Sequence, residues 1–95
     1  MKPGYLYILE CADGSFYTGS TVDLKRRLNQ HRAFQGARYT ARKWPLRLVY
    51  WEYYSSIVDA FRREKQIQGW SHAKKRALIA GHHDELQELA RNRQA

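Results

Sequence analysis

The stretch YLYILECADGSFYTGSTVDLKRRLNQH, residues 5–31, decides how this chain folds. Residues 5–9 are aromatic, β-branched or aliphatic and predict a strand, and the extended pattern resumes over residues 15–19. The intervening CADG favours a turn, so the two strands are expected to form a β-hairpin. A basic helix follows directly, with Leu24 and Leu28 forming an apolar seam along it.

The length of the turn determines which way the tyrosines of the hairpin point. With a two-residue loop, Tyr17 lies opposite Glu10 and on the other face of the sheet from Tyr7. With a three-residue loop in which Gly14 is left-handed, Tyr17 lies opposite Leu9 and shares a face with Tyr7. Both loops suit the sequence, and we predict the second because it brings the two phenols together. Tyrosines in strands are usually packing residues, so the pair alone does not indicate chemistry.

The helix after the hairpin places two basic side chains beside its apolar seam. Ser20 or Thr21 can cap this helix, with Asp23 in its first turn. Arg27 and His31 are four residues apart and flank the seam rather than oppose it. We therefore expect both side chains to point toward a cleft between the helix and the sheet.

The whole series resembles the GIY-YIG nuclease family. Tyr5-Leu6-Tyr7 stands for the GIY element and Tyr17-Thr18-Gly19 for the YIG element, with Arg27 and His31 following at regular spacing. The resemblance covers most of the chain. It is strongest to small bacterial proteins made of this domain and little else, and it extends to the nuclease domain of eukaryotic structure-selective DNA endonucleases.

Length and charge limit what else the chain can be. Its 95 residues predict a single domain, 1–95, with a core over about 4–81. The net charge is +8, and between Lys25 and Arg76 fourteen Lys or Arg residues stand against three acids. This concentration predicts a polyanionic partner, nucleic acid before membrane, although a merely soluble basic surface is the alternative.

The cysteine count and hydropathy exclude several classes of protein. A single cysteine, Cys11, excludes an internal disulfide and a multi-cysteine zinc site, and fits a reducing compartment. No apolar run is long enough for a signal-peptide core or a membrane span, so we expect a cytoplasmic protein.

Basic and aromatic residues are interleaved over residues 33–45, which contain Gly36 and Pro45 and read as a loop. Such residues can stack on bases and neutralise phosphates, although the aromatic ones can equally fold back onto the core. The predicted nucleic-acid-binding residues are Lys25, Arg38, Tyr39, Arg42, Lys43, Lys74 and Lys75.

Residues 46–54, LRLVYWEYY, predict the strongest strand and the third of a small antiparallel sheet. Strict alternation places Leu46, Leu48, Tyr50 and Glu52 on one face, and Arg47, Val49, Trp51 and Tyr53 on the other. Both faces are largely apolar, so we expect helices to cover much of both. The expected fold class is α+β, a three-stranded antiparallel sheet flanked by helices.

A helix capped by Ser55 or Ser56 and closed by Gly69 should follow. Its apolar stripe contains a carboxylate, Glu64, among Ile57, Ala60, Phe61 and Ile67. An inward carboxylate needs a partner, either a salt bridge to an arginine such as Arg27 or a metal ion. The resemblance implies a metal, because family members hold a divalent cation on a glutamate at this place. A single carboxylate with waters and a substrate phosphate suits Mg²⁺, or Mn²⁺.

The last third of the chain predicts two further helices. Ser71 caps a helix over residues 72–80 that Gly81 ends, and another is expected over about 84–93. Arg76 stands where the family often has an asparagine, which leaves open what serves that role. The adjacent pair His82-His83 is expected to be a surface feature, because no third metal ligand is nearby.

The resemblance implies a metal-assisted phosphodiester hydrolysis with five catalytic residues. Tyr17 is the general base or the group that orients water, with a pKa that neighbouring cations must lower. Tyr7 assists by hydrogen bonding, Arg27 pairs with phosphate oxygens, and Glu64 holds the metal. His31 is either a second phosphate contact or a proton relay.

Two other functions remain open at the level of sequence. One is a nucleic-acid-binding module without catalysis. The joint presence of Tyr7, Tyr17, Arg27, His31 and Glu64 argues against it, because binding does not need an inward carboxylate. The other is an enzyme that acts on RNA rather than DNA, since phosphate contacts do not distinguish the two. For a nuclease this small we expect selectivity for the shape of DNA rather than its sequence, and a protein partner is possible.

Overall fold

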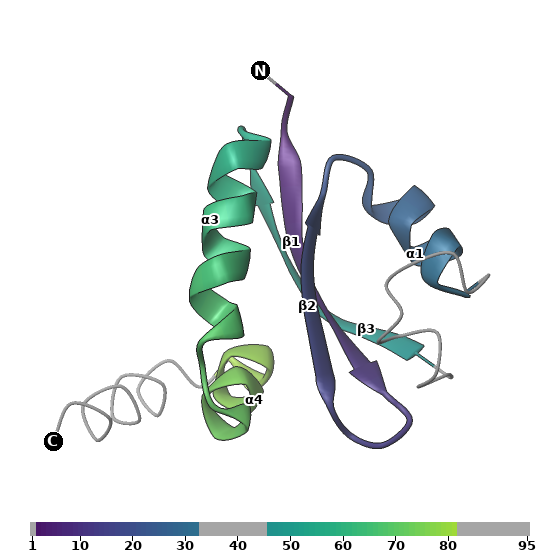
Figure 1. Ribbon diagram of the computed structural model, residues 1–95, viewed down its shortest axis with the longest axis vertical. Helices are drawn as coiled ribbons and strands as arrows, with labels where there is room; N and C mark the ends of the chain where they lie inside the picture. Colours follow the sequence, from purple (N-terminus) through teal and green to yellow (C-terminus); the bar gives the residue numbers. More distant parts are fainter. Residues whose placement is uncertain (1, 33–45, 82–95) are drawn as a thin grey trace, which may run out of the picture.

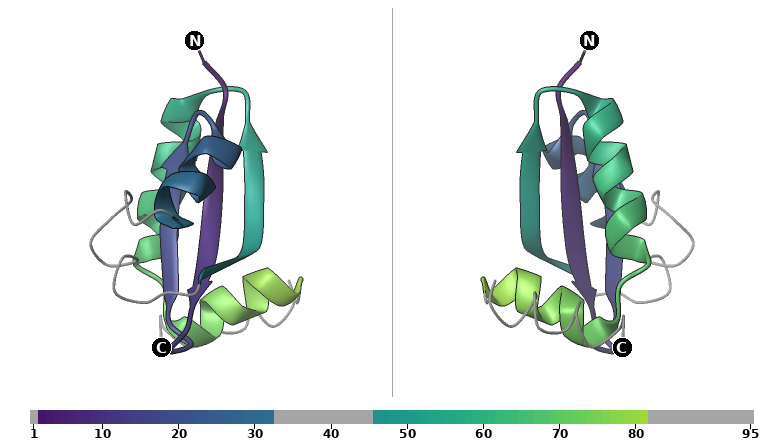
Figure 2. Two further views of the ribbon diagram at one scale, coloured as in Figure 1. Left: turned by 90° about the vertical axis from the view of Figure 1, so that its right-hand side faces the viewer. Right: turned by 90° about the vertical axis from the view of Figure 1, so that its left-hand side faces the viewer.

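The computed structural model describes residues 2–32 and 46–81. Its sheet has three antiparallel strands, β1 (Gly4–Cys11), β2 (Phe16–Thr21) and β3 (Leu46–Tyr54), in the order β2-β1-β3. The helices of the described residues are α1 (Leu24–Arg32), α3 (Ile57–Gln68) and α4 (His72–Ala80). Figure 1 shows α3 and α1 on opposite sides of the β1-β2 hairpin, and the views in Figure 2 agree. The predicted α+β fold with a three-stranded antiparallel sheet is confirmed.

The hairpin has the longer of the two predicted turns. The backbone N–H of Cys11 donates to the carbonyl of Ser15 at 2.9 Å, and Gly14 is left-handed with φ 83°. Leu9 consequently pairs with Tyr17. Because side chains alternate along a strand, Tyr7 and Tyr17 share one face of the sheet, as predicted.

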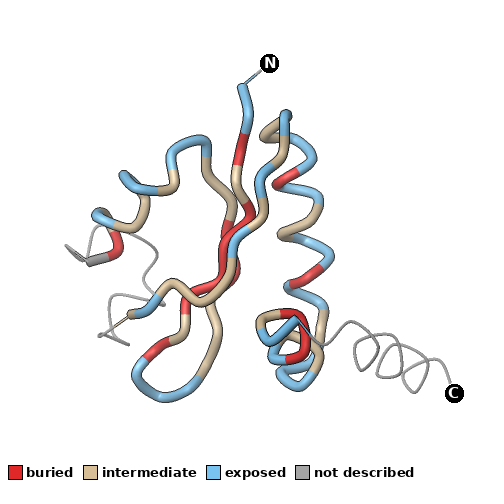
Figure 3. The backbone as a smooth tube through the Cα atoms, turned by 180° about the vertical axis from the view of Figure 1, so that it is seen from behind, coloured by how far each residue is buried: buried red, intermediate tan, exposed pale blue. Residues whose placement is uncertain are grey.

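The core lies between the sheet and the two later helices. Leu6 and Ile8 of β1 pack against Ile67 of α3 and Leu78 of α4, and all four are almost completely buried. Burial is concentrated along β1 (Figure 3), because this strand lies between the other two and has covered faces. Its nearly unbroken apolar run reflects that position.

The faces of β3 differ from the prediction because of a bulge. Ile8 pairs with Tyr50 while Leu9 pairs with Leu48, which leaves Val49 as an extra residue. Leu48 and Tyr50 therefore lie on opposite faces, and Val49 packs against the core. The predicted alternation is therefore wrong for residues 46–49. A sequence pattern of period two does not show where a bulge inserts an extra residue into a strand.

The two faces of the sheet are also covered less than predicted. Trp51 and Tyr53 are 53% and 54% exposed, so in the described part of the chain no helix covers this stretch of β3. On the other face, Glu52 accepts hydrogen bonds from Tyr50, Tyr54 and Arg63. Burial raises the pKa of Glu52, but these hydrogen bonds outweigh burial and hold its pKa below the usual value.

The helix boundaries follow the predicted caps except at α1, and one residue of the predicted α3 stripe is exposed. Ser56 and Ser71 cap α3 and α4, and Gly81 ends α4 with φ 77°. The cap of α1, however, is Asp23, whose Oδ1 accepts from the Arg26 N–H at 3.0 Å. Phe61 does not belong to the buried stripe of α3, since it is 46% exposed.

Some sequence predictions concern residues outside those described. The helix expected over 84–93 and the pair His82-His83 are among them. Within the described residues, no helix is long and apolar enough to cross a membrane.

Candidate active site

The side chain of Tyr7, from β1, extends over the neighbouring edge strand β2. Tyr7 is fully buried and stands opposite Gly19 of β2. A Cβ atom at Gly19 would lie only 2.6 Å from the Tyr7 hydroxyl oxygen, so the phenol occupies the space that a side chain there would take. The glycine of the YTG frame thus allows the hydroxyl of Tyr7 to reach the outer edge of the sheet.

The predicted histidine joins the two phenols. His31, from the last turn of α1, lies with Nε2 3.1 Å from the Tyr7 hydroxyl. Its ring centroid is 5.2 Å from that of Tyr17, and the two tyrosine rings are 6.3 Å apart. Burial lowers the pKa of His31 below 6.5, and the charge of Arg27 lowers it further, so the imidazole is neutral at pH 7. At 1% exposure His31 does not face solvent, which favours a relay over a direct phosphate contact.

Against the larger effect of burial, Arg27 supplies a positive charge that lowers the pKa of both tyrosines. Its Nη1 donates to Gln30 at 3.2 Å, while its buried Nε has no hydrogen-bond partner among the described residues. With Arg26 it lines a cavity of about 190 Å³ next to the start of α1. Within the described residues no ion pair joins Arg27 to Glu64, so the salt bridge considered from the sequence is not formed. The guanidinium is available to bind an anion.

Glu64 comes from the opposite face of the sheet. Its side chain is 13% exposed, as expected for an inward residue of α3. Its Oε1 accepts from the Ser20 hydroxyl at 2.6 Å, and its Oε2 accepts from the Gln68 amide at 2.8 Å. Ser20 therefore binds this carboxylate rather than capping α1.

Gln68 is a site residue that the sequence analysis missed. Its amide donates both to Glu64 and, at 3.2 Å, to the carbonyl of Thr18 on β2. The signal was present in the spacing, because residues four apart on a helix lie on the same side. A glutamine four positions after an inward carboxylate is placed to hold it.

The two halves of the site meet across β2. Tyr17 and Gly19 face Tyr7 on one side of this strand, whereas the alternate residues Thr18 and Ser20 face α3 on the other. Since β2 is an edge strand, groups from both faces can converge at its free side. Burial is the largest cause of the raised pKa of both tyrosines, and the negative charge of Glu64 on the other side of β2 adds to it.

The electrostatics of the tyrosines differ from the prediction. Burial, chiefly, raises the pKa of Tyr7 to about 12 and also raises the pKa of Tyr17. The charge of Arg27 lowers both, but it does not outweigh burial. The expectation of a lowered Tyr17 pKa is wrong for the protein alone, because the sequence does not reveal how deeply the phenol is buried. Both phenols are protonated at neutral pH.

The donor set around Glu64 fits a magnesium-type ion. No group of three or more His, Cys, Asp or Glu side chains gathers anywhere in the described residues, which excludes a caged zinc-like site there. Each carboxylate oxygen of Glu64 accepts one side-chain hydrogen bond, and Oε2 also lies 3.5 Å from Nζ of Lys65, so Oε1 keeps a lone pair for a cation. One carboxylate with waters and phosphate oxygens is a common Mg²⁺ arrangement.

The predicted nucleic-acid-binding residues are only partly described. Lys75 lines a groove of about 260 Å³ together with Tyr17 and Gln68, and so borders the site. Lys74 lies 4.2 Å over the Trp70 ring, and Lys25 lines a larger cavity beside α1. Arg76 is exposed on α4. The remaining predicted residues lie outside those described: Arg38, Tyr39, Arg42 and Lys43.

Comparisons with known proteins identify the family of the chain. The model of the GIY-YIG catalytic domain matches residues 3–77. A UPF0213 protein of Streptococcus agalactiae is 42% identical over 83 residues, which are 87% of this chain and 94% of that protein. A UPF0213 protein of Halobacterium salinarum is 43% identical over 75 residues, 79% and 97% of the two chains.

Two solution NMR structures are similar as well. Protein EF2693 from E. faecalis aligns with a TM-score of 0.60 at 32% identity, covering 87% of this chain and 88% of that one. The UPF0213 protein BH0048 from Bacillus halodurans aligns with a TM-score of 0.55 at 42% identity, covering 82% and 83%. The chain therefore belongs to the GIY-YIG family of nuclease catalytic domains.

Proposed function

We propose that this protein is a divalent-metal-dependent nuclease that hydrolyses phosphodiester bonds in DNA and selects DNA by shape. Membership of the family supports hydrolysis of nucleic acid. The observation that carries the proposal is the convergence of two phenols, a neutral imidazole, a guanidinium and a carboxylate around one edge strand. A module that only binds nucleic acid has no need of an inward carboxylate with an open lone pair.

The phenols and the imidazole form a path for a proton. In this path Tyr17 accepts a hydrogen bond from the attacking water and donates to Tyr7, whose ring centroid lies 6.3 Å from its own. Tyr7 in turn reaches Nε2 of His31. As the water oxygen bonds to phosphorus, each hydroxyl passes its own proton onward, and the last proton arrives on the neutral imidazole. Neither phenol has to ionise in isolation, which agrees with their raised pKa values.

The charged groups stabilise the phosphate in the transition state. Arg27 pairs with the phosphate oxygens, and its buried Nε provides a donor that no described residue uses. Glu64 would hold Mg²⁺ or Mn²⁺, which when bound supplies positive charge at the leaving 3′ oxygen. Ser20 and Gln68 keep the Glu64 carboxylate in place.

The substrate class follows from charge and size. A net charge of +8 on 95 residues favours a polyanion, and a small domain has little area with which to read base sequence. We therefore propose that the substrate is DNA with branches, flaps or ends, with RNA as the competing substrate. The protein would act on this DNA in repair or processing in the cytoplasm. A protein partner that completes the binding surface is compatible with this small size.

The test is a cleavage assay on labelled linear, flapped and branched DNA and on matched RNA. The wild type is compared with Glu64→Ala and with Asp59→Ala, which removes an exposed carboxylate from the same helix. Each is assayed with Mg²⁺, Mn²⁺ and EDTA after circular dichroism shows that it is folded. We expect metal-dependent cleavage that falls about 10²-fold or more in Glu64→Ala and is retained in Asp59→Ala. Tight binding without cleavage under every condition would favour the binding module instead.

A further inference from the structure

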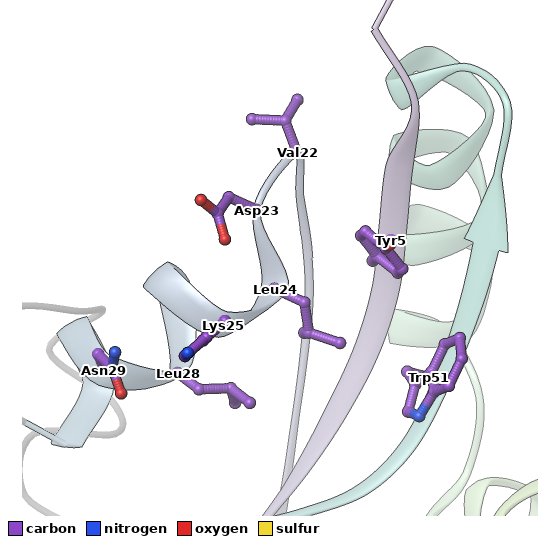
Figure 4. A pocket seen from close by; sticks show the side chains of 8 residues that line it. All are labelled: Tyr5, Val22, Asp23, Leu24, Lys25, Leu28, Asn29 and Trp51. Atoms are coloured by element: carbon purple, nitrogen blue, oxygen red, sulfur yellow. The ribbon is translucent and has the colours of Figure 1, made fainter.

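We propose that a cavity between α1 and the sheet binds an unpaired nucleobase of the substrate strand. The inference rests on the proposed function, since it assumes that the substrate is a nucleic acid. The cavity has a volume of about 640 Å³ and lies on the same face of the sheet as Tyr7. Figure 4 shows its two walls, with Tyr5 and Trp51 on the sheet and Leu24 and Leu28 on α1.

The wall on the sheet is a cluster of exposed aromatic rings. Tyr5 packs edge-on against Trp51, with ring centroids 6.0 Å apart, and against Tyr53 at 5.5 Å. More than half of the Trp51 and Tyr53 surfaces is nevertheless exposed. Neither side chain belongs to the core cluster. A contiguous exposed group of large aromatic residues marks a binding surface, and aromatic faces suit stacking against a flat ring.

The opposite wall gives the cavity the shape of a slot. Leu24 and Leu28 project from α1 toward the sheet (Figure 4), so aliphatic groups face aromatic ones across the opening. Lys25 and Asn29 also line the cavity. A flat ring between the walls would stack on the indole, while the Asn29 amide offers both a donor and an acceptor to its edge.

The slot adjoins the candidate active site in two ways. Tyr5 and Tyr7 are two residues apart in β1 and so share a face, and Trp51 stands directly opposite Tyr7 in the β1-β3 pairing. The cavity also shares Val22 and Asp23 with the smaller one that Arg27 lines. A phosphate bound at Arg27 therefore brings a flanking nucleotide to the aromatic wall.

Charge distinguishes a nucleotide from other occupants. Lys25 lines the cavity, Arg26 and Arg27 line the adjoining one, and these three cations outnumber the one carboxylate that lines both, Asp23. A second copy of the chain also has a net charge of +8 and would be repelled, whereas a phosphate backbone is attracted. A paired base is stacked inside its duplex and cannot enter a slot, so the ligand is an unpaired base. Substrates with an unpaired nucleotide beside the scissile phosphate follow as the preferred class.

The test measures binding alone, by fluorescence anisotropy of a labelled single-stranded DNA at low salt. Trp51→Ala should bind the single strand about 10-fold more weakly than the wild type, and Trp51→Phe should retain most of the affinity. Both variants should bind blunt duplex DNA as tightly as the wild type does. Phe61→Ala is the matched control, because it removes an exposed aromatic ring from α3, outside the cavity. Circular dichroism checks that every variant is folded.

A second DNA identifies the base as the ligand. Replacing nucleotides of the strand by abasic sites should weaken binding to the wild type but not to Trp51→Ala. Equal affinity of Trp51→Ala and the wild type for single strands would overturn the proposal. It would also be overturned if Trp51→Ala lost as much affinity for duplex as for single strands, or if the wild type did not bind single strands at all. Loss of a dimer in Trp51→Ala by sedimentation would instead assign the surface to self-association. Since no step of this test needs cleavage, it can succeed where the nuclease proposal fails, and the reverse.

Discussion

Replacing Gly19 by alanine tests whether the glycine of the YTG frame exists to admit Tyr7. A Cβ atom there would lie 2.6 Å from the Tyr7 hydroxyl oxygen and 2.7 Å from Cζ. Ordinary contact begins at 3.4 Å, so the ring or the strand must move by about 0.8 Å. Tyr7 is fully buried, which leaves the ring no open space to move into.

The expected magnitudes follow from this displacement. Inserting a methyl group into a packed site costs about 1–3 kcal/mol, and losing the hydrogen bond to His31 costs about 0.5–1.5 kcal/mol more. Alanine recovers about 0.5–1 kcal/mol through its lower backbone entropy. The free energy of unfolding should therefore fall by about 0.5–4 kcal/mol. A shift approaching 1 Å in a catalytic group lowers kcat by about 10²-fold.

Gly4→Ala separates the loss of stability from the loss of catalysis. Its Cβ atom would lie 2.6 Å from Cδ1 and 2.8 Å from Cα of Ile57, so it should also destabilise the fold, but it does not touch Tyr7. Urea unfolding gives the stability of both variants, and single-turnover cleavage per folded molecule gives the chemistry. If Gly19→Ala cleaves at the wild-type rate, or if Gly4→Ala loses as much rate, the assigned role of Gly19 is wrong.

Three further predictions address other parts of the site and fold. Gln68→Ala should weaken Mn²⁺ binding by about 10-fold in calorimetry because Glu64 loses its amide donor, whereas removal of the surface side chain in Gln66→Ala should not. The folded state of the wild type resists protonation of His31, so the free energy of unfolding should decrease as pH falls below 6.5 toward the lower folded pKa. Denaturation measured from about pH 5 to 8 should show that the unfolding free energy of His31→Gln depends less on pH than that of the wild type. Glu52→Ala should lower the free energy of unfolding by about 3 kcal/mol, because it removes the acceptor shared by two tyrosines and an arginine, while cleavage per folded molecule stays unchanged. The stabilisation from Glu52 is present above its unfolded pKa of about 4.5 and is lost as pH falls through the lower folded value.

The features that could be predicted from sequence are those set by local rules. Local turn chemistry narrows the hairpin to two loop lengths, and the choice of the longer one, with Gly14 left-handed, rests on bringing the two phenols together. The serine caps of α3 and α4 and the inward position of Glu64 likewise depend only on neighbouring residues. These predictions hold because period and capping act over one or two turns of chain.

The features that could not be predicted depend on contacts between distant segments. The bulge at Val49 is a property of the β1-β3 pairing, which joins segments forty residues apart. Burial of the phenols decides the direction of the Tyr17 pKa shift, and it requires α1 to fold over the hairpin. Ser20 reads as a helix cap in sequence, but its hydroxyl is taken by Glu64 across 44 positions of chain.

The free edge of β2 explains how so small a chain can assemble this site. An exposed edge strand normally invites pairing with another strand, because its outer backbone groups lack partners. Here Gln68 donates to the Thr18 carbonyl of that strand and to Glu64 with the same amide group. One side chain thus ties α3 to the edge and orients the proposed metal ligand, while the phenols of Tyr7 and Tyr17 lie on the opposite face of the sheet. A nucleic acid that contacts both the phenols and Glu64 must approach along the β2 edge. Its flanking base then lies over the face of the sheet that carries Tyr7 and Trp51.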